Sequence, residues 1–401
     1  MSGDVLNLLS ERAYRAEDVE RFLDPAVPTW ARFDPELGYV LGDIVMKDGM
    51  EGSCTFSRYE PGGQRRMLQF ADRPCRVNTY GDSFTQCHQS SDGETWQEYL
   101  AAHLGEPIRN FGVGGYGVYQ AYRRALRVEA GELAAPYVVL NIWDDDHVRN
   151  LDASRWLRLG DFARQLGDRR YILFHGNPWV HLRFDPGNSR FVERTSLCST
   201  PDDLRRLCDA DRFCETFKDD PIVRLHVLKG GGRVDRLDDL EALSEAFGLR
   251  LDLRHDDTRA RHAAQLHIEY GLRATEYVLD RMRAWADAEG RRLMVLLSCR
   301  MSAIIRAAEG KPRFDQRMLD YLATHEIPFV DGLSKHVEDF DQFRISPQEY
   351  VERYYIGHYS SAGNHFFAFA VKNTLVDWLD PKPPAYRDEG QAWAVMAARL
   401  A

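Results

Sequence analysis

Five short apolar segments alternate with amphipathic stretches, and this alternation restricts the fold more than any other feature of the chain. The segments are four to seven residues long, rich in β-branched or aromatic side chains and bounded by Gly, Pro or polar residues, as buried strands are. The predicted strands are Cys75–Tyr80, Ile108–Phe111, Tyr137–Trp143, Arg292–Leu297 and Ile327–Asp331. The predicted helices are Thr95–Leu104, Val118–Ala130 and His262–Ala288. Because alternating strands and helices form βαβ units, the sequence predicts an α/β fold with a parallel sheet between helices.

Two long regions do not follow this alternation, and 401 residues are more than one ordinary core of about 250 to 300 residues requires. We expect an N-terminal extension, residues 1–72, that is irregular but apolar enough to pack on the core. The main domain then covers residues 73–380, and a tail covers residues 381–401.

An insertion, residues 171–260, interrupts the main domain. Its sequence predicts a hairpin of Tyr171–Phe174 and Trp179–Phe184, followed by a polar and mostly helical stretch. Such an insertion can shape a substrate cleft. It can equally serve oligomerisation, so that a homo-oligomer stays possible, or only cover the sheet.

The charge balance excludes some partners. With 52 Lys and Arg against 62 Asp and Glu, the net charge of −10 argues against nucleic-acid binding. No apolar run approaches the roughly 20 residues of a membrane span, and the first residues do not resemble a signal peptide. We therefore expect a cytoplasmic protein without a membrane span. Its seven scattered cysteines predict free thiols, and their spacing does not favour a zinc site.

A serine follows the first predicted strand, in the sequence Gly81-Asp82-Ser83. At the carboxyl end of a parallel strand, this residue would lie in the crevice where α/β proteins bind ligands. Backbone N–H groups at the start of the next helix could stabilise an oxyanion beside Ser83. The alternative is that Ser83 only caps that helix.

The second and third predicted strands end in glycines and in carboxylates, respectively. Gly112, Gly114 and Gly117 match the dinucleotide pattern G-x-G-x-x-G, but the acidic residue that this pattern requires at the end of the next strand is misplaced. Asp144–Asp146 follow the third strand and are either a solvated turn or, less favoured, ligands of a magnesium ion.

A histidine near the carboxyl end could act as a general base. His358 lies in a predicted loop just before an apolar helix, from which it could reach back over the sheet edge toward Ser83. His365 is the rival candidate, but its place within that helix favours a packing or capping role.

Taken in this order, these segments resemble the SGNH (GDSL-like) hydrolase family. The matching blocks are Gly81-Asp82-Ser83-Phe84-Thr85, Asn110-Phe111-Gly112-Val113-Gly114-Gly115 and His358-Tyr359-Ser360-Ser361-Ala362-Gly363-Asn364. The resemblance implies a flavodoxin-like, three-layer α/β/α fold with a five-stranded parallel sheet. It also implies hydrolysis of an ester, on a small molecule or as an O-acetyl group on a carbohydrate, without a cofactor or a metal. Ser83 would be the nucleophile and His358 the base, while N–H groups of Ser83 and Gly115 would bind the oxyanion.

The sequence departs from the family at two positions. Asp145 stands where the third block usually supplies an asparagine donor, and an ionised aspartate would repel an oxyanion. Tyr355 stands where the triad acid is expected, and Asp331, at the end of the fifth strand, is the nearest substitute. Glu352 and Asp341 are the other carboxylates that could replace it, and a serine–histidine dyad with the ring held by a backbone carbonyl is the further alternative. A serine esterase is the leading prediction. The alternatives are an acyltransferase on the same fold and a catalytically impaired, ligand-binding pseudoenzyme.

Overall fold

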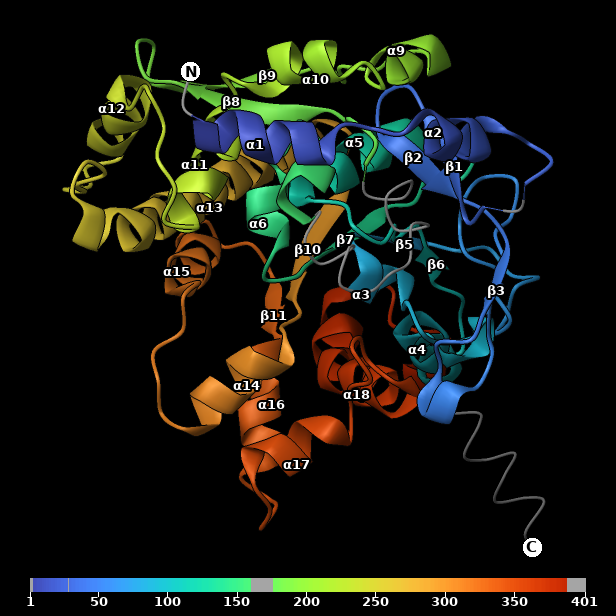
Figure 1. The fold of residues 1–401 in the computed structure, drawn as a ribbon. Coiled ribbons are helices and arrows are strands. Elements are labelled where there is room, and N and C mark those ends of the chain that lie inside the picture. The colour runs from blue at the N-terminus through green and yellow to red at the C-terminus, as the bar shows by residue number, and fades with distance from the viewer. Residues whose placement is uncertain (1–2, 28, 160–175, 388–401) are drawn as a thin grey trace, which may run out of the picture.

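The computed structural model describes residues 3–27, 29–159 and 176–387, and its centre is a five-stranded, all-parallel sheet (Figure 1). The strands lie in the order β11-β10-β7-β5-β6. Their bounds are Val77–Tyr80 (β5), Arg109–Asn110 (β6), Tyr137–Ile142 (β7), Arg292–Leu297 (β10) and Phe329–Asp331 (β11). Counted along the chain, this is the order 2-1-3-4-5, which is compatible with a flavodoxin-like fold. The predicted α/β architecture is confirmed, although every predicted strand except Arg292–Leu297 is shorter than expected.

Strand β7 is the middle of the sheet, and all six of its residues are buried. It pairs with β5 from Val77 opposite Tyr137, and with β10 from Arg292 opposite Tyr137. A strand covered by helices on both faces must be apolar on both, which explains its nearly continuous hydrophobic sequence.

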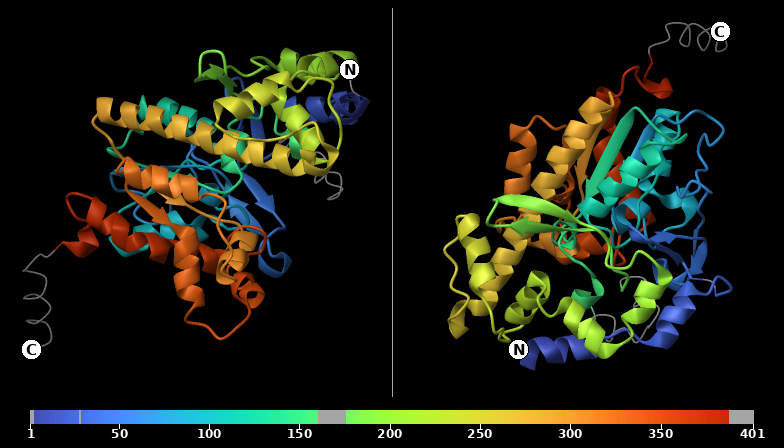
Figure 2. Two further views of the ribbon diagram at one scale, coloured as in Figure 1. Left: turned by 90° about the vertical axis from the view of Figure 1, so that its left-hand side faces the viewer. Right: turned by 90° about the horizontal axis from the view of Figure 1, so that it is seen from above.

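Helices cover both faces of the sheet (Figures 1 and 2). One face packs against helices α5 (Val118–Glu129), α13 (Asp256–Ala288) and α15 (Gln316–Thr324). The other face packs against α4 (Trp96–Leu104), α14 (Met301–Ala308), α16 (Gly332–Phe340), α17 (Pro347–Glu352) and α18 (Ser361–Trp378). The long helix α13 begins six residues before the predicted start at His262, inside the region assigned to the insertion.

The described part of the N-terminal extension is not irregular, contrary to expectation. It forms the helices α1 (Gly3–Arg12) and α2 (Ala16–Leu23), a hairpin of β1 (Ala31–Asp34) with β2 (Gly38–Leu41), and a hairpin of β3 (Ile44–Met46) with β4 (Thr55–Ser57). Pro25, Pro35 and Pro61 lie in turns outside these elements, so they delimit short helices and strands rather than prevent them. Leu9 and Tyr39 are fully buried in the same core as β7.

The insertion contains a hairpin that the sequence did not predict. Strand β8 (His181–Asp185) pairs with β9 (Arg190–Arg194) across a turn that contains Pro186 and Gly187, whereas the predicted partner, 171–174, lies outside the described residues. Four helices follow: α9 (Pro201–Arg206), α10 (Ala210–Phe217), α11 (Pro221–Lys229) and α12 (Asp238–Ala246). Helix α11 packs along α13, and α10 packs against α1, so the insertion covers the α13 side of the sheet (Figure 1).

Three other expectations concern the whole chain. All seven cysteines lie among the described residues, and none forms a disulfide. None of the helices in residues 3–27, 29–159 and 176–387 is long and apolar enough to cross a membrane. Most of the predicted tail, residues 388–401, lies outside the described residues, and the domain boundaries at residues 73 and 380 stay predictions.

Candidate active site

Ser83 is the first residue of the short helix α3 (Ser83–Gln86), directly beyond the end of β5. The turn depends on Gly81, whose φ of 150° is unusual for other residues and whose added Cβ would lie 2.4 Å from the carbonyl oxygen of Asn141. The helix cap is Asp82, because its carboxylate accepts the Phe84 N–H at 2.8 Å. Ser83 is therefore not the cap, and its hydroxyl is available for another partner.

That partner is His358, whose Nε2 lies 2.9 Å from the Ser83 Oγ although 275 positions separate the two residues. The loop that holds His358 is fixed on its carboxyl side by Ser360, which caps α18 by accepting the Gly363 N–H. Burial lowers the pKa of His358 well below its ordinary value, and the neighbouring His88 and Arg149 lower it further. The imidazole is thus neutral at neutral pH, as a general base must be.

Gln89 holds the other nitrogen of the His358 ring. Its Oε1 lies 3.0 Å from Nδ1 of His358 and also accepts the backbone N–H of His358 at 2.9 Å, while its Nε2 donates to the Asp48 carbonyl oxygen. This network fixes the orientation of the amide, with oxygen toward His358. The Nδ1 atom of His358 must then carry the proton, which leaves a lone pair on Nε2 for the Ser83 hydroxyl.

The backbone around this contact is unusual. Gln89 has a φ of 68°, in the left-handed region that residues other than glycine rarely occupy. Gly357 has a φ of 115°, and a Cβ at this position would lie 2.8 Å from the Gln89 Oε1. Strained backbone of this kind is concentrated at functional sites, where the surrounding structure maintains it.

The structure does not bring Asp331 to His358. The Asp331 carboxylate is bound by Arg313 at 2.6 Å and by the Ser334 hydroxyl, and these contacts hold its pKa below the ordinary value although burial acts in the opposite direction. Tyr355 is buried and donates to the carbonyl oxygen of Cys299. The expectation that Asp331 orients the base therefore fails, because a guanidinium from the neighbouring loop has taken its carboxylate.

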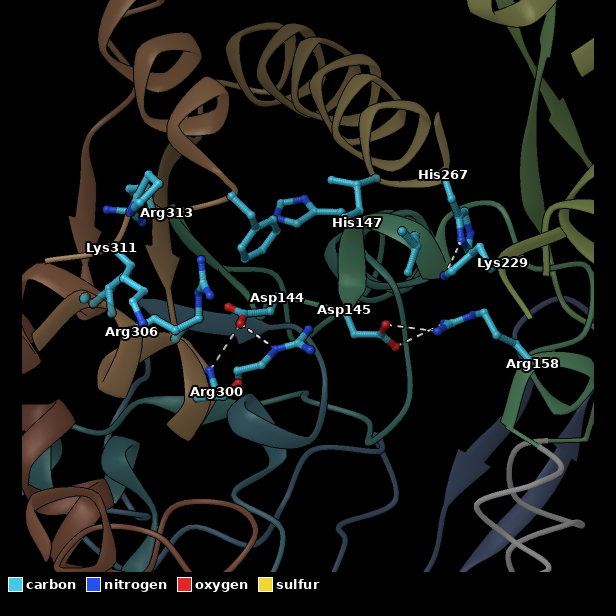
Figure 3. A pocket seen from close by; sticks show the side chains of 18 residues that line it. Asp144, Asp145, His147, Arg158, Lys229, His267, Arg300, Arg306, Lys311 and Arg313 are labelled. Atoms are coloured by element: carbon cyan, nitrogen blue, oxygen red, sulfur yellow. Dashed lines mark hydrogen bonds and ion pairs between the residues drawn. The ribbon is translucent and has the colours of Figure 1, made fainter. Parts of the chain in front are cut away.

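The three carboxylates after β7 are all paired with arginines, and Figure 3 shows Asp144 with Arg300 and Asp145 with Arg158. The shortest contacts are Asp144 with Arg300 at 2.7 Å, Asp145 with Arg149 and Arg158 at 3.0 Å each, and Asp146 with Arg149 at 2.6 Å. The cations around Asp145 hold its pKa well below the ordinary value against the effect of burial. Asp145 is thus ionised and cannot replace an asparagine donor.

No group of three or more His, Cys, Asp or Glu side chains in the described ranges is placed to hold a metal ion.

Arg149 connects these carboxylates with the nucleophile turn. It is nearly fully buried, and its Nη1 contacts Asp146 at 2.6 Å and lies 3.4 Å from Asp82 Oδ2. The same Asp82 oxygen lies 3.3 Å from the Ser83 Oγ. Burial raises the pKa of both Asp82 and Asp146, against the effect of Arg149. Arg149 thus supports the turn that presents Ser83.

The glycine-rich loop after β6 packs on this turn. The Val113 N–H donates to the carbonyl oxygen of Gly81, the Gly114 N–H donates to the Gln86 side chain, and a Cβ on Gly112 would lie 2.2 Å from the Gln86 nitrogen. The glycines are therefore explained by close packing against α3. Gly115 has a φ of 90°, and neither its N–H nor that of Ser83 has an acceptor among the described residues.

Two of the residues that build this site were missed in the sequence. Arg149 follows Asp146 and Asp145 by three and four positions, so helical spacing offered a signal for these ion pairs. Gln89 offered no comparable signal, because its role depends on a left-handed backbone and on a partner 269 positions away.

No protein-family model matches this chain, and no curated protein is similar to it.

Proposed function

We propose that this protein is a serine esterase of the SGNH type, with Ser83 as nucleophile and His358 as general base. The observation that carries the proposal is the 2.9 Å contact between Ser83 Oγ and Nε2 of a neutral imidazole whose Nδ1 is held by Gln89. A nucleophile, a base and a group that orients the base form the arrangement required for acyl transfer. Small-molecule esters and O-acetylated carbohydrates are the proposed substrates.

In this mechanism, Ser83 Oγ attacks the carbonyl carbon of the ester while its proton moves to Nε2 of His358. The tetrahedral intermediate collapses, the alcohol leaves with the proton from Nε2, and an acyl-Ser83 remains. Water then attacks the acyl group and gives a proton to Nε2. The collapse of the second intermediate returns this proton to Ser83 Oγ and releases the carboxylic acid.

The oxyanion would be bound by the N–H groups of Ser83 and Gly115, which have no other acceptor in the described ranges. Asp145 supplies no third donor, because it is ionised and paired with arginines. One missing donor typically costs on the order of 100-fold to 1,000-fold in rate. A neutral amide at Nδ1 also stabilises the imidazolium less than a carboxylate would. We therefore expect slow turnover.

The decisive experiment is labelling of the full-length protein with a fluorophosphonate probe, compared with Ser83→Ala. The proposal expects one label per chain on Ser83, none on the variant, and release of acetate from a short acyl ester only by the unmodified protein. An unlabelled wild-type protein that also fails to hydrolyse the ester contradicts the proposal.

A catalytically impaired, ligand-binding protein on the same site is the second candidate. It is favoured by two features: the amide in place of the triad acid and the ionised Asp145 in place of a donor. This candidate predicts that an ester binds equally to the wild-type protein and to Ser83→Ala, with no acyl-enzyme detectable by mass spectrometry. Detection of acetyl-Ser83 contradicts it.

A further inference from the structure

A cavity of about 490 Å³ lies at the carboxyl ends of β7 and β10, outside the Ser83 site (Figure 3). Its walls come from helix α6 (Asp146–Arg149), from α11, α13 and α14, and from the segment that connects α14 to α15. The volume is within the range of about 300 to 1,000 Å³ that is typical of small-molecule sites. The cavity thus has room for a molecule considerably larger than a single inorganic ion.

Cationic side chains dominate the polar lining of this cavity. They are Arg158, Lys229, Arg300, Arg306, Lys311 and Arg313. Four of the six are paired with carboxylates: Arg158 with Asp145 and Asp152, Arg300 with Asp144, Arg313 with Asp315 and Asp331, and Lys311 with Glu309. Most of the positive charge is therefore balanced within the protein.

Two cations are not balanced in this way. Lys229 and Arg306 have no carboxylate partner in the described part of the chain. The only contact of the Lys229 ammonium there is with Nδ1 of His267, at 3.1 Å. Burial lowers the pKa of Lys229, and the positive charge of Arg158 lowers it further. Lys229 and Arg306 are therefore the cations of the lining that remain available to an anionic ligand.

The two unbalanced cations belong to opposite walls. Figure 3 shows Arg306 beside Lys311 on the α14 side and Lys229 beside His267 on the far side of His147. A ligand with an anionic group at each end suits this arrangement of cations on opposite sides of the cavity.

Two histidines of the lining, His267 and His147, have unused hydrogen-bonding capacity. The Lys229 ammonium can only donate, so Nδ1 of His267 is the acceptor in their contact. The proton of the neutral His267 ring is therefore on Nε2, which has no acceptor within the described ranges. His147 Nδ1 donates to the Thr275 hydroxyl, since that hydroxyl itself donates to the Gly271 carbonyl oxygen. His147 Nε2 therefore has a lone pair for a ligand hydroxyl.

The cavity lining also offers an apolar surface. Phe314 and Ile268 line it and stay 42% and 40% exposed, and the Phe314 ring lies edge-on to His147. Large exposed apolar side chains inside a polar cavity suit the carbon skeleton of a bound molecule.

We propose that this cavity binds a small polyhydroxylated molecule that carries a phosphate group at each end. Arg306 and Lys311 would hold one phosphate, Lys229 and the His267 Nε2–H the other, and His147 a hydroxyl of the body. Phosphate suits these ends better than carboxylate does, because a dianion with three acceptor oxygens matches several converging donors.

Neither Ser83 nor His358 lines the cavity, and Trp143 contacts both Phe84, next to the nucleophile, and Arg300 of the cavity. The Trp143 ring stacks on Phe84 with a centroid distance of 5.3 Å, and the Arg300 guanidinium lies 5.2 Å from its centroid. Binding in the cavity therefore does not depend on Ser83, and the proposal stands or falls independently of the esterase.

Calorimetric titration of the full-length protein with fructose 1,6-bisphosphate, fructose 6-phosphate and fructose tests the proposal. We expect one site per chain, with the bisphosphate at least about tenfold tighter than the monophosphate and fructose without measurable binding. Lys229→Gln and Arg306→Gln should each lower the affinity for the bisphosphate to about that for the monophosphate. Ser83→Ala should leave all three titrations unchanged.

Arg261→Gln is the matched control, because Arg261 is an exposed arginine of α13 outside the cavity lining. Equal weakening by this control would show that binding follows net charge, and would overturn the proposal. A bisphosphate that binds no tighter than the monophosphate, or that binds both cavity variants as tightly as the wild type, would overturn it as well.

Discussion

The Ser83 site and the basic cavity lie at the same edge of one sheet, yet uncharged side chains act at the first and charged side chains line the second. At Ser83, the nucleophile, the base and the group that orients the base are all neutral, and burial keeps the His358 imidazole neutral. In the cavity, charged side chains predominate, and two cations lack a carboxylate partner within the described ranges. The ring of Trp143 contacts both Phe84, next to the nucleophile, and Arg300 of the cavity.

This difference shows how one sheet edge supports two kinds of chemistry. A general base needs a free electron pair, and burial leaves one on the His358 imidazole at neutral pH. A large excess of positive charge beside it would disfavour the imidazolium that forms when His358 takes the Ser83 proton. An anion site needs cations that the protein itself does not neutralise. Asp144 and Asp145 line the cavity and are each bound to arginines, so they offset part of its positive charge.

The largest expected effect is the loss of the base. His358→Ala should lower kcat/KM for a neutral acetyl ester on the order of 10,000-fold, because the Ser83 proton then has no acceptor in place. Steady-state kinetics measures this, and His365→Ala is the matched control. His365 is exposed and packs edge-on against Tyr99, so its removal should leave the rate unchanged. Equal losses in both variants would contradict the assignment of the base.

This contrast also marks what the sequence could predict. The alternation of apolar strands with helical patterns placed all five strands of the sheet, and the motifs placed Ser83 and His358 at one edge. Patterns of this kind depend on local periodicity and on the general rule that parallel strands end at one edge. The N-terminal hairpins and β9 could not be found in this way, because their short strands are defined by their partners.

The supporting residues were harder to predict than the reacting ones. Asp331 is at the end of the last strand, as expected, but Arg313 binds it from a loop whose path the sequence does not determine. Gln89 takes part only because its backbone is left-handed and Gly357 leaves room for its side chain. Neither the left-handed backbone of Gln89 nor its proximity to Gly357 can be recognised from residue type or spacing.

The second prediction concerns Gln89. Gln89→Leu should lower kcat about 100-fold with little change in KM, because Nδ1 of His358 loses the acceptor that fixes its proton and its orientation. Gln342→Leu, at an exposed position, is the control. A loss confined to KM would show that Gln89 contacts the substrate rather than the base.

Gln89→Glu sharpens the same point through pH dependence. Because burial lowers the pKa of His358, kcat/KM of the wild type should decrease only at a pH below 6.5, which is the ordinary pKa of histidine. A carboxylate beside Nδ1 favours the imidazolium and should raise this pKa, so activity should be lost at higher pH in the variant. An unchanged or lowered acidic limb would contradict the contact between Gln89 and His358.

A third prediction tests the close contact between Gly357 and the Gln89 side chain that holds His358. Gly357→Ala should lower the free energy of unfolding by about 1 to 3 kcal/mol and kcat about tenfold, because the new Cβ meets the Gln89 Oε1 in a left-handed backbone. Gly290→Ala is the control, since Gly290 also has a positive φ but its Cβ would meet no atom within 4 Å. It should cost about 1 kcal/mol without changing kcat. Equal kcat values in the two variants would separate Gly357 from catalysis.

The smallest expected effect is the difference in salt dependence between ligand binding in the cavity and ester hydrolysis at Ser83. Raising the ionic strength from about 0.1 M to about 1 M shortens the Debye length from about 10 Å to about 3 Å. The Kd for fructose 1,6-bisphosphate should then rise about fivefold, because its phosphates are held by partly exposed cations. Hydrolysis of a neutral ester should change by less than about twofold, because the reacting groups at Ser83 are buried and uncharged. Comparable changes in both measurements would contradict this contrast between the two sites.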